Sequence, residues 1–184
     1  MHTRTCVIDS NVLHSIEFTD LFVTFATRRL IQLRWSTAIL HEVQRSLLHD
    51  ARLSPDAIEH RLRSMQRALP DALAEFPDEL TENLQVASSD RHVLALAMSV
   101  GADSIITLNI RDFPVVYCRS LGVEIFTPDE ILTKTLIDDP LGTGWALREI
   151  AKRRHLPSAT VGELLSKWES RLPSFVAAAR EALG

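Results

Sequence analysis

The chain has 184 residues, which suits one domain of ordinary size with a small appendage. It is 46% hydrophobic and 24% charged, as expected of a soluble globular protein, and its formal charge of −4 argues against binding nucleic acid through bulk positive charge alone. The two distant cysteines and the lack of a long apolar run predict a cytoplasmic protein without disulfides, signal peptide or membrane span.

The first predicted element is a short buried strand over residues 3–8, which are mostly β-branched or apolar. Asp9 follows it directly, and Ser10 and Asn11 favour turns and helix starts. In open α/β sheets ligands bind at the carboxyl ends of strands, so Asp9 lies where chemistry is usual. The structural alternative is that Asp9 only caps the next helix.

Apolar periodicity and helix-start residues predict the elements that follow. They are a helix to about residue 29 broken near Phe18 and Thr19, a strand over 30–35, a helix over 37–48 capped by Ser36 or Thr37, and a helix from Pro55 that ends before Pro70. The acidic stretch 70–83 then predicts a loop with one helical turn.

Short strands continue to alternate with helices in the next segment. The predictions are a strand over 84–87, a helix from Asp90 to Val100 that ends at Gly101, strands over 102–107 and 122–126, and a helix that starts at Thr127. This alternation predicts an α/β fold with a central parallel sheet between two layers of helices, a three-layer α/β/α arrangement.

The pattern changes near Leu136. Residues 138–144 resemble a linker, and the rest predicts only helices, over about 145–154, 160–171 and 173–183. We therefore divide the chain into an α/β domain over residues 1–136 and a helical C-terminal extension over 137–184. We expect the extension to dock on the main domain, with Trp168 and Phe175 in the contact.

Three acids stand near the ends or starts of predicted elements: Asp9, Glu42 and Asp90. Oxygen ligands suit a hard divalent cation such as Mg²⁺ or Mn²⁺, which can activate water for attack on a phosphate. Each acid also has a structural explanation, because Asp9 and Asp90 could be helix caps and Glu42 a solvated helix residue.

The order and flanks of these acids carry more information than their spacing. The relevant segments are Val7-Ile8-Asp9-Ser10-Asn11-Val12-Leu13, Leu40-His41-Glu42-Val43, Asp90–Ala97, Ala102–Pro114 and Thr127–Leu132. Together they resemble the PIN-domain ribonucleases, and among these the toxins of bacterial VapBC-type toxin–antitoxin pairs, in the branch with a helical tail. The similarity spans about residues 4–135.

The resemblance implies an endoribonuclease that uses Mg²⁺ or Mn²⁺ to hydrolyse RNA phosphodiester bonds. It implies as partners an RNA substrate and an antitoxin protein with a basic tail, with a homodimer left open. By motif position the catalytic acids are Asp9, Glu42, Asp90 and Asp112, and the metal ligands are Asp9, Glu42, Asp90, Asn109 and Asp112. Candidate substrate-binding residues are Ser10, Asn11, Arg91, Thr107 and Arg111.

The chain departs from the family pattern at the fourth acidic position. Many members carry Asp where this sequence has Asn109, and Asp112 three residues later is the alternative source of charge. For Arg91 and His92 the sequence favours a solvated helical turn over phosphate contact. The basic run Arg148, Lys152, Arg153, Arg154 and His155 fits RNA binding and a solvated helix end equally.

Two other functions compete with the nuclease. One is a catalytically weak PIN-like module that binds nucleic acid or protein, which Asn109 favours and the retention of Asp9, Glu42 and Asp90 disfavours. The other is a haloacid-dehalogenase-type phosphatase, which also begins with a strand and Asp. That chemistry needs a second Asp two residues later, where this chain has Asn11.

Overall fold

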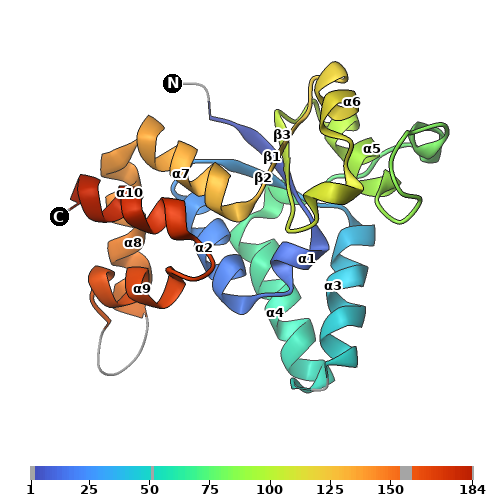
Figure 1. Cartoon of the computed structure of the whole chain (residues 1–184). Helices are drawn as coiled ribbons and strands as arrows, with labels where there is room; N and C mark the ends of the chain where they lie inside the picture. The colour runs from blue at the N-terminus through green and yellow to red at the C-terminus, as the bar shows by residue number, and fades with distance from the viewer. Residues whose placement is uncertain (1–2, 51, 154–158, 184) are drawn as a thin grey trace.

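Four short parallel strands form the centre of the molecule (Figure 1). The computed structural model describes residues 3–50, 52–153 and 159–183. The strands are β1 (Thr5–Ile8), β2 (Gln32–Arg34), β3 (Ser104–Ile106) and β4 (Glu124–Phe126), in the order β2-β1-β3-β4. The predicted parallel sheet is confirmed, although all four strands are shorter than predicted.

The two central strands are the most apolar, as expected when both faces of a parallel sheet are covered. Val7 lies opposite Ile105 in the ladder, and both side chains are fully buried. Because all strands run in one direction, the residues after β1 and β3 meet at the same edge. The Asp9 amide donates to the carbonyl of Ile106, which places Asp9 beside Thr107.

Helices cover both faces of the sheet (Figure 1). Helix α5 (Arg91–Ser99) packs on β1 and β3. Helix α2 (Ile16–Thr27) packs on β2, and α7 (Pro128–Asp138) packs on β4. The remaining helices are α1 (Ser10–Leu13), α3 (Thr37–His49), α4 (Pro55–Ala68), α6 (Val115–Ser120), α8 (Pro140–Arg153), α9 (Val161–Trp168) and α10 (Pro173–Leu183). These layers agree with a three-layer α/β/α fold.

The break in the first helical segment is four residues earlier than predicted. It falls between α1 and α2, at His14 and Ser15, rather than near Phe18. Ser15 has extended backbone angles, and its hydroxyl accepts a hydrogen bond from the Phe18 amide at 3.4 Å. The hydroxyl thus starts a new helix, and the apolar residue Phe18 faces the core.

Two other element predictions are wrong. Residues 84–87 are irregular with a bend at 85–86, and their apolar side chains Leu84 and Val86 are buried by packing instead of strand pairing. The predicted linker over 138–144 is largely helical, since α7 ends at Asp138 and α8 begins at Pro140. The Asp139 carboxylate accepts a hydrogen bond from the Gly142 amide at 2.8 Å and starts α8.

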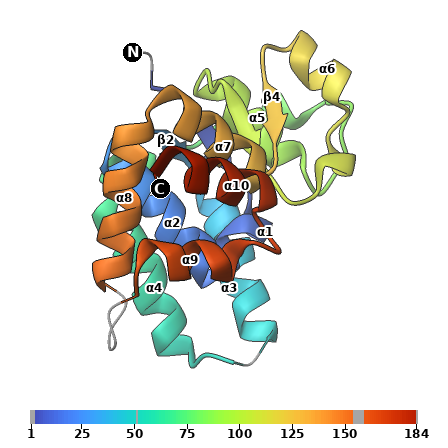
Figure 2. The same ribbon diagram turned by 60° about the vertical axis from the view of Figure 1, so that its left-hand side comes forward.

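The C-terminal helices dock on the main body, as predicted. Helix α8 packs on α2 and α7, and α10 lies across α7 and beside α9 (Figure 2). The rings of Phe25 and Phe175 meet edge to face with centroids 6.4 Å apart. One continuous buried cluster includes side chains of the sheet region and of α8, α9 and α10.

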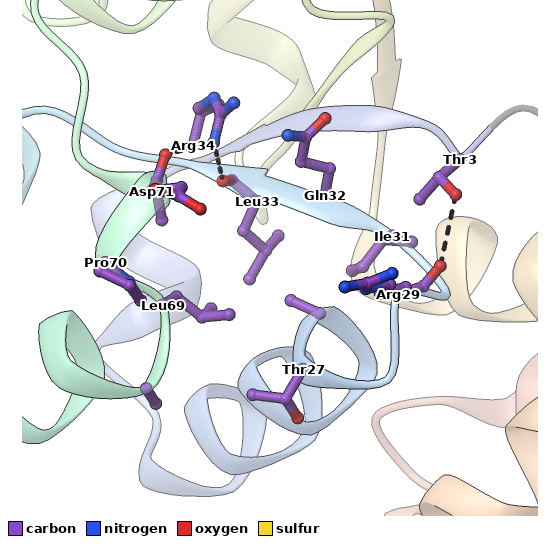
Figure 3. Close-up of a pocket in the computed structure, with 13 residues that line it drawn as sticks. Thr3, Thr27, Arg29, Ile31, Gln32, Leu33, Arg34, Leu69, Pro70 and Asp71 are labelled. Atoms are coloured by element: carbon purple, nitrogen blue, oxygen red, sulfur yellow. Dashed lines mark hydrogen bonds between the residues drawn. The ribbon is translucent and has the colours of Figure 1, made fainter.

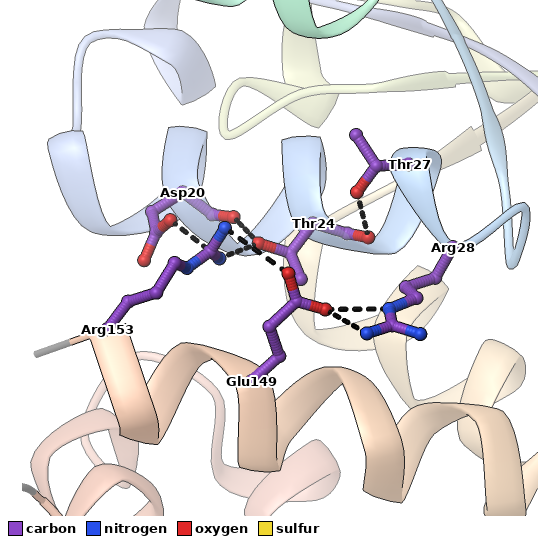
Figure 4. Close-up of polar contacts among 6 residues, drawn as sticks. All are labelled: Asp20, Thr24, Thr27, Arg28, Glu149 and Arg153. Atoms are coloured by element: carbon purple, nitrogen blue, oxygen red, sulfur yellow. Dashed lines mark hydrogen bonds and ion pairs between the residues drawn. The ribbon is translucent and has the colours of Figure 1, made fainter.

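Part of the predicted basic run serves this docking (Figure 4). Arg153 of α8 forms an ion pair with Asp20 of α2 at 3.1 Å, whereas Arg148 lies over the ring of Trp145 in the same helix and does not bridge the two parts. Arg154 and His155 lie outside the described residues. Among the residues that are described, no helix has both the length and the apolar character needed to cross a bilayer.

Candidate active site

Asp9 is a buried carboxylate at the carboxyl end of β1. It occupies the N-cap position of α1, with extended backbone angles of φ −74° and ψ 152°, yet its side chain makes no capping hydrogen bond to that helix. The residue is only 3% exposed. The capping explanation for Asp9 is therefore wrong, and its oxygens are used in another way.

Three side chains hold the Asp9 carboxylate. The Asn11 amide donates to Oδ2 at 2.6 Å and the Thr107 hydroxyl donates to the same oxygen at 2.7 Å. A longer contact of 3.4 Å joins the Ser10 hydroxyl to Oδ1. These donors come from both sides of the β1–β3 pair, so the orientation of Asp9 depends on two distant segments of the chain.

Thr107 is the hub of this network because every hydrogen-bonding position of its hydroxyl is used. It donates to Asp9 and accepts from the Asn11 side-chain amide and from the Asn109 backbone amide, each at 3.0 Å. Asn11 in turn accepts from the Leu108 amide at 3.0 Å. The structure thus assigns Asn11 and Thr107 to positioning Asp9, while their predicted contact with substrate stays a prediction.

The pKa of Asp9 lies above its ordinary value of 3.8. Burial is the main cause, because removal of water disfavours the charged form. Hydrogen bonds from the Thr107 side chain and from the Ser10 backbone oppose this effect, whereas the charges of Asp90 and Glu42 reinforce it. The carboxylates of Asp90 and Glu42 therefore lie close enough to Asp9 to disfavour its charged form.

Glu42 of α3 faces His92 of α5. The His92 Nε2 atom is 3.4 Å from Glu42 Oε1, and the His92 side chain is 16% exposed. Burial alone would raise the pKa of Glu42, but the contact with His92 and a hydrogen bond from Ser10 lower it. For His92, burial opposes protonation, but Glu42, Asp9 and Asp90 together raise the pKa above its ordinary value.

His92 is the site residue that sequence reasoning undervalued. The structure places it among the three acids rather than in a solvated turn. The only signal for it in the sequence was its position two residues after the predicted acid Asp90. His41, the other histidine beside a predicted acid, is exposed.

Asp90 begins α5 without capping it. It sits at the N-cap position, but its carboxylate accepts no hydrogen bond from the described first turn of the helix. It accepts instead from the Ser89 hydroxyl at 2.7 Å. The next residue, Arg91, is half-buried, and its Nε has no hydrogen-bond partner among the described groups. The capping explanation for Asp90 is therefore also wrong.

The fourth acidic position is not filled by a contact that the structure describes. Asn109 is exposed, and the group it contributes to the network is its backbone amide. Asp112 closes the short 3-10 turn Ile110–Asp112 and is not among the charges that shift the pKa of Asp9. Arg111 is exposed on the same turn. Which residue completes the site stays a prediction.

The donor atoms suit a hard divalent cation, because Asp9, Glu42 and Asp90 all present carboxylate oxygens. These three carboxylates do not, however, form a complete set of metal ligands. Within residues 3–50, 52–153 and 159–183, no three His, Cys, Asp or Glu side chains are grouped closely enough to hold a metal ion.

The chain matches no protein-family model, and comparison with curated proteins and with solved structures gives no match. The functional assignment therefore depends on the residues of this chain and on their arrangement.

Proposed function

We propose that the protein is a divalent-cation-dependent endoribonuclease of the PIN type, acting as the toxin of a toxin–antitoxin pair. The observation that carries the proposal is the buried Asp9 carboxylate, which is oriented by two side chains and repelled by Asp90 and Glu42. A fold keeps such an arrangement at a cost in stability, which points to a functional use.

Asp9 and Asp90 would hold the cation, with Glu42 as the third acid. When bound, Mg²⁺ or Mn²⁺ would polarise a phosphodiester and lower the pKa of an attacking water. Asn11 and Thr107 keep Oδ2 of Asp9 in a fixed direction, so the side chain enters the reaction without reorganising. Cation binding would also relieve the repulsion among the three acids.

Two positive groups beside the acids would contact the substrate. Arg91 is half-buried and follows Asp90 in the chain, and guanidinium groups bind phosphates well. His92 contacts Glu42, and the charges of Glu42, Asp9 and Asp90 raise its pKa. We assign both to the RNA backbone, and the low overall charge of the chain makes such local contacts necessary.

Cleavage of a labelled single-stranded RNA, with and without Mg²⁺ or Mn²⁺, tests this function. We expect cation-dependent cleavage by the wild-type protein and none by Asp9→Asn purified in the same way, which controls for contaminating nuclease. Asp56→Asn is the matched control, because Asp56 is an exposed residue at the start of α4. Cation-independent cleavage, or equal cleavage by Asp9→Asn, would exclude the proposed chemistry.

The competing function is a binding module with little catalysis, which the absence of an acid at Asn109 favours. The two are separated by measuring RNA binding and cleavage on the same samples. A binding module should retain RNA affinity and show no cation-dependent turnover. In that case Asp9→Asn should bind RNA at least as well as the wild type, since it removes a negative charge.

The toxin role makes a further claim about the natural inhibitor. A desolvated acidic site attracts a cationic side chain, so we propose that the antitoxin inserts an Arg or Lys beside Asp9 and Asp90 and competes with the metal. It should also cover apolar surface, because ion pairs alone seldom give durable binding. Co-expression with alanine variants of the partner's basic tail tests this. Inhibition that survives loss of every basic tail residue would contradict it.

A further inference from the structure

Arg61 of α4 is buried although it carries a positive charge. It is only 9% exposed, and burial lowers the pKa of its guanidinium. Among the residues that the structure describes, no carboxylate forms an ion pair with it. A buried charge without an opposite charge lowers stability unless hydrogen bonds compensate for it. The acceptors that bind this guanidinium therefore indicate why the chain keeps it.

The guanidinium binds at the break between α1 and α2. Its Nη2 atom lies 2.6 Å from the Leu13 carbonyl oxygen and 3.2 Å from the His14 carbonyl oxygen. The same atom donates to the Thr19 hydroxyl at 2.9 Å, and that hydroxyl donates to the Leu13 carbonyl at 2.9 Å. The carbonyl end of α1 thus receives its donors from side chains of α2 and α4, and not from the backbone of a continuing helix.

The break has a simple alternative, in which α1 and α2 join into one helix. In a continuous α-helix the Leu13 carbonyl would accept from the Glu17 amide. The His14 carbonyl would likewise accept from the Phe18 amide, which in the structure donates to the Ser15 hydroxyl. The guanidinium of Arg61 therefore replaces backbone amides at the two carbonyls where the helix is interrupted.

The break determines the direction of α1, and α1 carries contacts of the candidate active site. This helix has only four residues, too few to be stable alone, so its direction depends on contacts with other segments. The Leu13 amide donates to the Asp9 carbonyl at 3.3 Å, while the Leu13 carbonyl accepts from Arg61. Asn11 on the same helix donates to the Asp9 carboxylate. One residue thus links the buried guanidinium to the backbone of Asp9.

The two helices that Arg61 joins are loosely packed at their other end. A cavity of about 450 Å³ opens between the C-terminal ends of α2 and α4, with Thr27 and Leu69 in its lining (Figure 3). Apolar packing between the two helices is interrupted there. The hydrogen bond from Arg61 to Thr19 joins them near the start of α2 instead. The position of the break therefore depends on this polar contact more than on the packing of the two helices.

We propose that Arg61 is a positioning residue for the candidate active site, because it maintains the break between α1 and α2 and so keeps the Asn11 amide directed at Asp9. Its effect on catalysis rests on the proposed nuclease function, whereas its effect on Asn11 does not. Without the guanidinium, the Leu13 and His14 carbonyls lose a donor that a continuous helix would restore. Such a helix would change the direction of α1 and weaken the hydrogen bond from Asn11 to Asp9.

The first test follows Asn11 in the full-length protein without RNA. Arg61→Met removes the donors and keeps an unbranched apolar side chain. The probe is the side-chain amide of Asn11 in ¹H–¹⁵N NMR spectra, assigned by its absence in Asn11→Ala. In Arg61→Met we expect this signal to move upfield, toward the position of a solvated amide, because its hydrogen bond to Asp9 is weakened.

Met65→Ala is the matched control for that measurement. It truncates a buried side chain one turn later on α4 and leaves the hydrogen bonds of Arg61 in place, so it lowers stability without touching the break. Its Asn11 signal should match that of the wild type. An unchanged Asn11 signal in folded Arg61→Met, or an equal change in Met65→Ala, would overturn the proposal.

Cation-dependent RNA cleavage gives the second test. In Arg61→Met, kcat should fall by about tenfold or more because a displaced Asp9 is costly for the reaction, while KM for RNA should change by less than about twofold because the buried Arg61 does not bind RNA. Arg61→Lys keeps one donor group and should recover part of the loss. A wild-type kcat in Arg61→Met, or an equal fall in Met65→Ala, would refute the catalytic effect. If the wild type cleaves no RNA, the nuclease function fails, and the Asn11 signal still decides the positioning role.

Thr19→Val covers the case in which Arg61→Met does not fold. It removes the hydroxyl that links Arg61 to the Leu13 carbonyl, and it keeps the shape of a side chain that is 5% exposed. We expect the same upfield movement of the Asn11 signal and a smaller fall in kcat, since the direct bond from Arg61 to Leu13 remains. A wild-type Asn11 signal in folded Thr19→Val would then contradict the proposal.

Discussion

Charged side chains do different work at the sheet edge and at the contact between α2 and α8. At the sheet edge, burial raises the pKa of Asp9, and the two carboxylates of Asp90 and Glu42 raise it further. At the contact between the helices, opposite charges alternate: Arg28 pairs with Glu149 at 2.6 Å and Arg153 pairs with Asp20 at 3.1 Å (Figure 4). One arrangement is electrostatically unfavourable and the other is favourable.

The charged residues of the two regions are therefore expected to affect stability in opposite ways. Exposed ion pairs contribute little, about 0–1 kcal/mol each, so the C-terminal helices are held mainly by buried groups such as Phe175. The acids at the sheet edge lower stability instead. Removing a charge should therefore have opposite effects in the two regions, which gives a set of direct tests.

The largest effect is expected for Asp9→Asn. Cleavage of RNA should fall by about 10³-fold or more, because metal-assisted catalysis is worth several kcal/mol. The thermal midpoint should stay the same or rise, since the variant removes a desolvated charge and keeps the volume. A single thermal melt and one cleavage assay check both parts. A variant that is inactive because it has lost its fold would contradict the second part.

Phe175→Ala should destabilise the protein by about 3–5 kcal/mol, because a fully buried ring that contacts Phe25 leaves a cavity. Urea denaturation measures this loss. Val116→Ala is the control, since Val116 is 85% exposed and its truncation should have no measurable effect. If Phe175→Ala behaves like the control, the C-terminal helices do not share the main core.

The stability of the protein should depend on pH in a way that reports the titration of Asp9. Its pKa is raised in the folded state, so the folded chain binds more protons than the unfolded chain above the ordinary value of 3.8. The stabilising contribution of the protonated Asp9 to the free energy of unfolding is thus fully present below pH 3.8, and it is lost as the pH rises through the raised pKa. The stability advantage of Asp9→Asn should grow over the same window. An advantage that is constant with pH would argue against a raised pKa.

The smallest effect is expected for Glu149→Gln at the α2–α8 contact. The loss should be below about 1 kcal/mol and should shrink further in high salt, because the partners Arg28 and Arg153 are about half exposed. Glu181→Gln, at an exposed position of α10, is the control. A loss as large as that of Phe175→Ala would mean that the ion pairs, and not the core, hold the two regions together.

The sequence predicts the local starts of elements best, because the signals are local. Ser36 and Thr127 cap helices as predicted, and Thr127 forms a capping box with Glu130. Gly101 has a positive φ after α5, as its position predicts. The false strand at Leu84 and Val86 shows the limit, since a short apolar run is buried equally well in a strand or in a turn.

The candidate site is less predictable than the fold, because its key contacts join distant residues. Motif order identifies Asp9, Glu42 and Asp90 but not the Glu42–His92 contact, which depends on how α3 packs near α5. The three hydrogen bonds of Thr107 likewise cannot be predicted from the sequence, because its partners come from two separate segments. The wrong linker prediction at Gly142 has a local cause instead, because the Asp139 side chain accepts a hydrogen bond from the Gly142 amide and starts a helix there.

The hydrogen bond from Thr107 to Asp9 also sets an order of events during protein synthesis. The two residues are 98 positions apart, so the first acid of the site is made early and its orienting hydroxyl late. Strand β1 likewise pairs on one side with β3, a contact of long sequence separation that forms slowly. A nascent chain that carries the Asp9 motif alone lacks an oriented carboxylate, and the site matures only after more than half of the chain has left the ribosome.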